Sequence, residues 1–244
     1  MTVNRVTISV GALVTATVTL SLLAIVMSWT GSPRLDMWCW FAVCLTGELL
    51  WLRLPLDRAT VSMAACFNFT TLLLLSRSDA MLAVALSVLA AELIIMRKPL
   101  VRSLFNAAQS SLAAGAASLT IAALSGGSND PAMLMANLRL LPLVAGAACY
   151  YAVNRTAVSL AIGVSQGISP LKAWRVNFGN HHELLSSATL FSLGVLVAVC
   201  HRLTGIVGAA LAVLPLVIAC DAYRRQLESA VAPLEPCAQT KAAA

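Results

Sequence analysis

The chain has 244 residues, of which 59% are apolar and 11% are charged. A soluble domain carries about 45 to 50% apolar and about 25% charged residues. The 16 basic and 10 acidic side chains of this chain are too few to cover the surface of a water-soluble globule. The composition excludes an ordinary soluble protein and indicates an integral membrane protein. The net charge of +6 fits the excess of Lys and Arg in cytoplasmic loops of membrane proteins, and no basic run or aromatic platform indicates a nucleic-acid partner.

Apolar runs bounded by charged residues, Pro or Gly predict eight membrane spans, because a helix needs about 20 apolar residues to cross the hydrocarbon. In chain order the spans cover residues 7–29, 37–52, 60–76, 79–96, 104–125, 139–162, 184–201 and 203–222. The predicted fold class is all-α, a polytopic integral membrane helical bundle of about eight transmembrane helices. Residues 1–223 are expected to form this domain, and residues 224–244 a short disordered cytoplasmic tail.

The distribution of basic residues predicts the topology. With eight spans, eleven Lys and Arg residues fall on the side of the N-terminus and four on the other side. Basic residues collect in cytoplasmic loops, so both termini are expected to face the cytoplasm, across a bacterial inner membrane.

The third span is the shortest of the eight. Residues 61–75 give fifteen uninterrupted residues, about 22 Å of helix against a hydrocarbon core of about 30 Å. We expect this segment to be tilted, broken or re-entrant. Asn68, in its middle, is expected to be shielded by protein rather than to face lipid.

The longest cytoplasmic connection contains a predicted surface helix. Ser169 followed by Pro170 is a helix-start signal, with the serine as N-cap and the proline at the first helical position. An apolar face then runs through Leu171, Trp174 and Phe178. Because the basic residues turn away from that face, the helix is expected to lie at the membrane surface.

Polar and charged residues also fall inside the predicted spans, in the cytoplasmic half of the membrane. They are Glu48, Glu92, Asn106, Gln109, Asn154 and Arg155. An ionised side chain there costs on the order of 2.5 to 3.5 kcal/mol, so each needs a partner. We expect Arg155 to pair with Glu48 or Glu92, while the amides of the fifth span orient the carboxylates. Two interpretations stay open: a hydrated cluster that binds a ligand or couples a signal, or polar contacts that only hold helices together.

His181, His182 and Glu183 precede the seventh span, but their spacing does not predict a metal site. Adjacent histidines do not share a helical face, and no HExxH motif is present. We expect a solvated interfacial cluster. The sequence contains no recognisable metal, cofactor or enzyme motif, so no metal, cofactor or enzymatic activity is predicted. An intramembrane enzyme with isolated catalytic residues stays an alternative.

Two stretches of the chain carry a further pattern. The first combines residues 53–56, 61–62 and 72–75 with residues 97–109, which end in the segment Phe105-Asn106-Ala107-Ala108-Gln109. The second combines residues 150–154 with residues 165–178. Together, over roughly residues 45–225, they resemble the N-terminal multi-pass membrane region found ahead of HD-GYP phosphodiesterase and GGDEF cyclase domains in bacterial signalling proteins.

The resemblance implies a sensory or ligand-binding membrane module that passes a change of state to a cytoplasmic domain turning over cyclic di-GMP. The resemblance supports a ligand-binding or coupling role for the positions that match the family pattern. These positions are Asn106, Gln109, Asn154, Arg175 and Asn177. No catalytic domain follows the last span, so the preferred hypothesis is a non-enzymatic sensor that acts through a cytoplasmic or membrane protein partner. The alternatives are a structural accessory subunit of a larger membrane complex and the membrane component of a small-solute uptake system.

Overall fold

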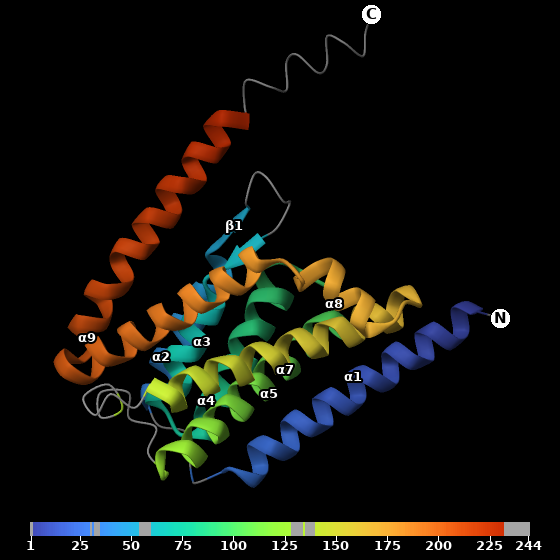
Figure 1. The fold of residues 1–244 in the computed structure, drawn as a ribbon, viewed down its shortest axis with the longest axis horizontal. Coiled ribbons are helices and arrows are strands. Elements are labelled where there is room, and N and C mark those ends of the chain that lie inside the picture. Colours follow the sequence, from blue (N-terminus) through green and yellow to red (C-terminus); the bar gives the residue numbers. More distant parts are fainter. Residues whose placement is uncertain are drawn as a thin grey trace, which may run out of the picture.

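The computed structural model describes residues 2–29, 31, 35–53, 60–127, 134 and 140–231, and within them the chain is helical apart from short connections and one small hairpin (Figure 1). The elements in chain order are α1 (Thr2–Met27), α2 (Leu35–Leu49), β1 (Trp51–Arg53), β2 (Thr60–Ser62), α3 (Ala64–Leu74), α4 (Arg77–Leu89), the π-helix η1 (Ala90–Ile95), α5 (Leu100–Ser125), α7 (Leu140–Gln166), α8 (Pro170–Phe178) and α9 (His181–Val231). The predicted all-α class is confirmed.

Helix α5 lies inside the bundle and packs along both α4 and α7. Its alanine-rich face allows this close approach, since Ala113, Ala114 and Ala117 are fully buried. Helix α1 packs on α5, α2 packs on α4, and α3 packs on α9. Figure 1 shows α1 along one edge of the bundle and the C-terminal part of α9 standing away from its opposite edge.

Helix α3 is short and enclosed by protein. Its 11 residues span about 16 Å, about half of the 30 Å hydrocarbon core. Nine of those residues are buried, and Asn68 has an exposed fraction of 2%. The prediction of a short third segment with a shielded Asn68 is therefore confirmed. The antiparallel hairpin, in which Leu52 lies opposite Val61, precedes it.

Helix α9 bends sharply at Gly205, whose backbone angles are φ 71° and ψ −156°. A residue with a Cβ atom rarely adopts this conformation, so glycine is needed at the bend. The second arm turns back at the bend and diverges from the first (Figure 1), and the two arms correspond to the seventh and eighth predicted spans. The helix continues past residue 224, where the tail was expected to begin, to Val231; residues 232–244 lie outside the described residues.

Within the described residues, four helical segments are long and apolar enough to cross a membrane: Ile8–Met27, Arg77–Ile95, Leu100–Ser125 and Glu183–Pro215. The predicted count of about eight is not reached. Helices α2 and α3, with 15 and 11 residues, are too short. Helix α7 has 27 residues, but Asn154 and Arg155 within it lower its apolarity. The seventh and eighth predicted spans are the two arms of α9 on either side of Gly205, and the apolar segment Glu183–Pro215 runs through both.

Helix α8 begins where the sequence predicts. The Ser169 side chain caps its first turn by accepting a hydrogen bond from the backbone N–H of Lys172 at 3.2 Å, and Pro170 occupies the first helical position. Only Ala173 is buried, while Val176 has an exposed fraction of 74%. This helix therefore presents most of its side chains to the surroundings of the bundle.

Candidate ligand-binding cavity

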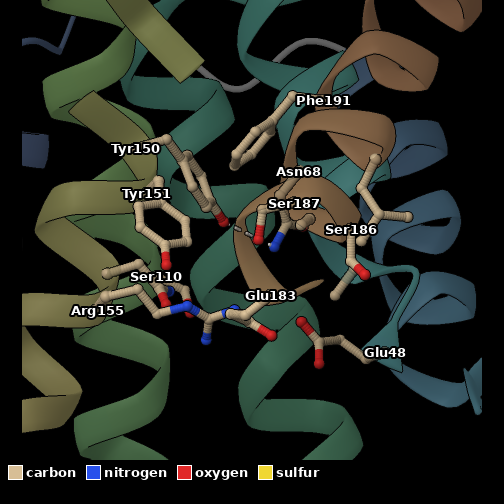
Figure 2. Close-up of a pocket in the computed structure, with 14 residues that line it drawn as sticks. Glu48, Asn68, Ser110, Tyr150, Tyr151, Arg155, Glu183, Ser186, Ser187 and Phe191 are labelled. Carbon is tan, nitrogen blue, oxygen red and sulfur yellow. Dashed lines mark hydrogen bonds and ion pairs between the residues drawn. The ribbon is translucent and has the colours of Figure 1, made fainter. Parts of the chain in front are cut away.

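A polar cavity of about 210 Å³ lies where α2, α3, α5, α7 and α9 meet. Each of these helices contributes at least one polar side chain to the wall, which includes Glu48, Asn68, Ser110, Tyr150, Tyr151, Asn154, Arg155, Glu183 and Ser187. Figure 2 shows Glu48 and Arg155 reaching in from opposite sides, with Glu183 between them in that view. The fold thus gathers polar groups that are far apart in the sequence around one space.

Arg155 forms an ion pair with Glu183, from its Nη2 to the Glu183 Oε1 atom. The same guanidinium lies 4.7 Å from the ring centroid of Phe178 and 5.5 Å from that of Tyr151. The prediction that Arg155 pairs with Glu48 or Glu92 is therefore wrong. Its partner is in the first turn of α9, in the segment expected to be a solvated interfacial cluster.

Two buried polar atoms of the cavity residues have no hydrogen-bond partner within the described part of the chain. Asn68 donates from Nδ2 to the Tyr150 hydroxyl at 3.3 Å, which leaves its carbonyl oxygen Oδ1 without a donor. The Nε–H of Arg155 similarly lacks an acceptor. An unsatisfied buried polar group costs about 1 to 3 kcal/mol, so Asn68 and Arg155, which both line the cavity, would each be stabilised by a further partner.

The cavity wall carries an excess of acidic groups. The ion pairs of the described residues join Arg155 to Glu183 and Lys98 to Glu92, and Glu48 belongs to neither pair. Two carboxylates therefore line the cavity with one guanidinium, and Glu48, which has the Asn68 side chain as a hydrogen-bond partner, is the carboxylate outside the Arg155 ion pair. This arrangement favours a bound group that carries a positive charge.

An aromatic cluster supports the wall behind Asn68. Tyr150 contacts Phe191 edge to face at a centroid distance of 5.5 Å, and Phe69 lies 5.1 Å from Phe191 and 6.5 Å from Tyr150. The three rings come from α3, α7 and α9. Because they fix these helices relative to one another, they also fix the position of the Tyr150 hydroxyl and of Asn68.

Glu92 lies apart from the cavity and has its own partners. The Nζ atom of Lys98 lies 2.6 Å from its Oε1, and the Asn106 amide donates to both carboxylate oxygens, at 2.8 and 3.0 Å. These contacts fasten η1 to the start of α5 across a turn in which Arg97 has a φ of 51°. The structure thus brings Asn106 to Glu92, as a link between helices rather than as part of the cavity.

The remaining predicted site residues take different places. Asn154 lines the cavity, and Gln109 lies beside it, donating from Nε2 to the Ser110 hydroxyl at 3.1 Å. Arg175 and Asn177 are exposed on α8, where the Asn177 amide donates to its own helix. Neither of these two is among the residues that line the cavity.

No group of three or more His, Cys, Asp or Glu among the described residues is placed to hold a metal ion. No protein-family model, curated protein or solved structure matches this chain. The functional argument therefore starts from the cavity and its contacts.

Proposed function

We propose that the chain is a non-enzymatic ligand-binding module of a bacterial inner membrane, and that it transmits the occupancy of its cavity to a cytoplasmic partner through α8. One observation carries this proposal: Arg155 lines the cavity, pairs with Glu183 at the start of α9, and lies against Phe178 at the end of α8. A ligand that accepts a hydrogen bond from the guanidinium competes with Glu183. Any shift of Arg155 then changes its contact with Phe178.

The cavity suits a small polar group. At about 30 Å³ per water molecule, a space of about 210 Å³ holds roughly seven waters. The Glu48 carboxylate, which is outside the ion pairs described above, and the unsatisfied oxygen of Asn68 favour a cationic donor, whereas the Arg155 Nε–H favours an acceptor. We propose binding rather than catalysis, because these groups complement a bound charge.

The proposed topology places the N-terminal end of α1, the hairpin and α8 in the cytoplasm. Figure 1 shows these three features at one end of the bundle and the bend of α9 at the other. The excess of Lys and Arg predicted for that side supports this orientation. In this arrangement the two arms of α9 cross separately and α7 also crosses, while α2 and α3 complete the bundle within the membrane.

Single cysteines test this orientation. Val176→Cys on α8 and Thr204→Cys beside the bend both replace exposed residues. A membrane-impermeant maleimide should label the first only in inverted vesicles and the second only in intact spheroplasts, above the labelling of the unmodified chain. Labelling of both from the same side contradicts the topology.

The resemblance to membrane regions that precede HD-GYP and GGDEF domains supports a cytoplasmic protein partner that turns over cyclic di-GMP. Helix α8 offers such a partner a surface, since Leu171 and Val176 have exposed fractions of 58% and 74%. The lipid bilayer is the second proposed partner, around the apolar outer faces of the long helices.

A spin label at position 176 of the full chain tests the coupling. Glu183→Gln replaces the ion pair with Arg155 by a weaker neutral contact. Arg155→Lys keeps the positive charge but loses the planar guanidinium that lies over the Phe178 ring. Both variants should change the mobility of the label, while a label at the distant exposed residue Leu119 should keep its spectrum. If both variants leave the α8 label unchanged, the coupling is refuted and the structural-subunit alternative is favoured.

A further inference from the structure

A second hollow adjoins the polar cavity. It is an apolar groove of about 550 Å³ between α7 and the first arm of α9, lined mainly by Leu143, Val144, Ala147, Ala188 and Val195. Val144 has an exposed fraction of 63% and Ala188 is also exposed, so the groove opens on the side of the bundle. In a membrane this side faces the acyl chains of the lipids.

The groove and the polar cavity share part of their walls. Tyr151, Ser187 and Phe191 line both hollows. Figure 2 shows Tyr151 and Phe191 at the upper part of the cavity and the charged groups Arg155 and Glu48 at its lower part. A molecule with a polar head and an apolar chain therefore fits the pair of hollows better than a fully polar solute does.

We propose that the ligand of this protein is a membrane phospholipid with an ethanolamine headgroup, held with its head in the polar cavity and an acyl chain in the groove. This inference rests on the proposed function, whose ligand it identifies. The ammonium N–H groups donate to the Glu48 carboxylate and the Asn68 carbonyl oxygen. The phosphate oxygens accept from Arg155, which has an unused buried Nε–H.

The same groups select against other headgroups. A choline head has no N–H to donate to the Asn68 carbonyl oxygen, which would stay unsatisfied. A glycerol head is neutral, so it leaves the phosphate charge uncompensated beside the two carboxylates of the wall. The selection therefore depends on Glu48 and Asn68, whereas retention of any lipid depends on the groove.

Native mass spectrometry of the full chain, released from detergent micelles, separates these contributions. The probe is an equimolar mixture of phosphatidylethanolamine, phosphatidylcholine and phosphatidylglycerol with identical acyl chains. The ethanolamine lipid should dominate the adducts. Glu48→Gln removes one charge-assisted hydrogen bond, so this preference should fall about tenfold. Equal adducts of the three lipids on the unmodified chain would overturn the inference.

Filling the groove tests the second half of the proposal. Ala188→Trp places a large side chain in the groove, and Ala210→Trp changes an equally exposed alanine of α9 outside it. The first should lower all lipid adducts several-fold and the second should not, with equal thermal unfolding temperatures for the two variants. Unchanged adducts in Ala188→Trp contradict a chain in the groove.

The soluble headgroup O-phosphoethanolamine, titrated into delipidated protein by calorimetry, distinguishes this inference from the proposed function. If it binds in a manner that depends on Glu48 while lipid adducts ignore Ala188→Trp, the cavity binds a polar solute and only the lipid assignment fails. If neither the soluble headgroup nor the lipid binds, both proposals fail. Binding of both, each lowered by Glu48→Gln, supports both.

Discussion

The link between η1 and α5 gives a quantitative test of how polar contacts stabilise this bundle. Glu92→Met removes the carboxylate that accepts from Asn106 at 2.8 and 3.0 Å, and Asn106→Leu removes the donor. Each single change leaves one polar partner without its bond, whereas the double change removes both. The difference between the double variant and the sum of the singles measures the contact itself.

The expected coupling between Glu92 and Asn106 is about 1 to 2 kcal/mol. A hydrogen bond to a charged group contributes about 1.5 to 3 kcal/mol in soluble proteins, but polar contacts between membrane helices average about 0.6 and reach about 1.7 kcal/mol. The Glu92 side chain has an exposed fraction of 8%, which favours the upper part of that range. The Lys98 side chain is 30% exposed, so its ion pair contributes less than about 1 kcal/mol.

Reversible unfolding by sodium dodecyl sulfate in mixed micelles, followed by circular dichroism, measures these free energies. Glu92→Met combined with Asn177→Ala is the control pair, since Asn177 bonds only within α8 among the contacts described. That pair should be additive within about 0.5 kcal/mol. A coupling below about 0.5 kcal/mol between Glu92 and Asn106 refutes the claim that this contact fastens η1 to α5.

Three further changes test the packing and the helix ends. Gly194→Ala should lower the thermal unfolding temperature, because the added Cβ would meet the Cys66 carbonyl oxygen at 2.6 Å. The control Gly11→Ala, which has open space around the added Cβ, should be neutral or should stabilise the protein by about 0.5 to 1 kcal/mol. Equal shifts of the unfolding temperature in the two variants would contradict the close approach of α3 and α9. Gly205→Ala should cost about 1 to 3 kcal/mol of unfolding free energy and lengthen the distance between spin labels on the two arms of α9; an unchanged distance distribution would show that glycine is dispensable at the bend. Ser169→Ala should speed amide hydrogen exchange in the first turn of α8 through the loss of about 1 kcal/mol of capping, and protection equal to that of the unmodified chain would count against the cap.

The sequence predicts the features that depend on local chemistry. The start of α8 follows from Ser169 and Pro170, and the short, shielded α3 follows from too few apolar residues with Asn68 among them. The end of α5 also matches the predicted span, because Gly126, with a φ of 73°, stops the helix there. In each case a few neighbouring residues decide the outcome.

Features that depend on which helices are neighbours could not be predicted in the same way. Depth along the membrane suggested that Arg155 meets Glu48 or Glu92, but depth does not fix the rotation or the adjacency of helices. Glu183 lies close because α9 begins beside the C-terminal half of α7, and its acidic side chain in that first turn was the available signal. The predicted span count was too high because α2 and α3 are too short to cross a membrane, and because Asn154 and Arg155 lower the apolarity of α7.

The bend at Gly205 makes the second arm of α9 a helical rod that pivots at this glycine, with Pro215 inside it. From residue 206 to Val231 the rod measures about 39 Å, and outward side chains such as Leu211 and Ile218 have exposed fractions of 67% and 58%. A rotation of about 10° at the pivot therefore displaces its far end by about 7 Å. The direction of this rod is thus governed by the two backbone torsions of Gly205 and by the contacts that Ala209 and Val213 make beside the bend.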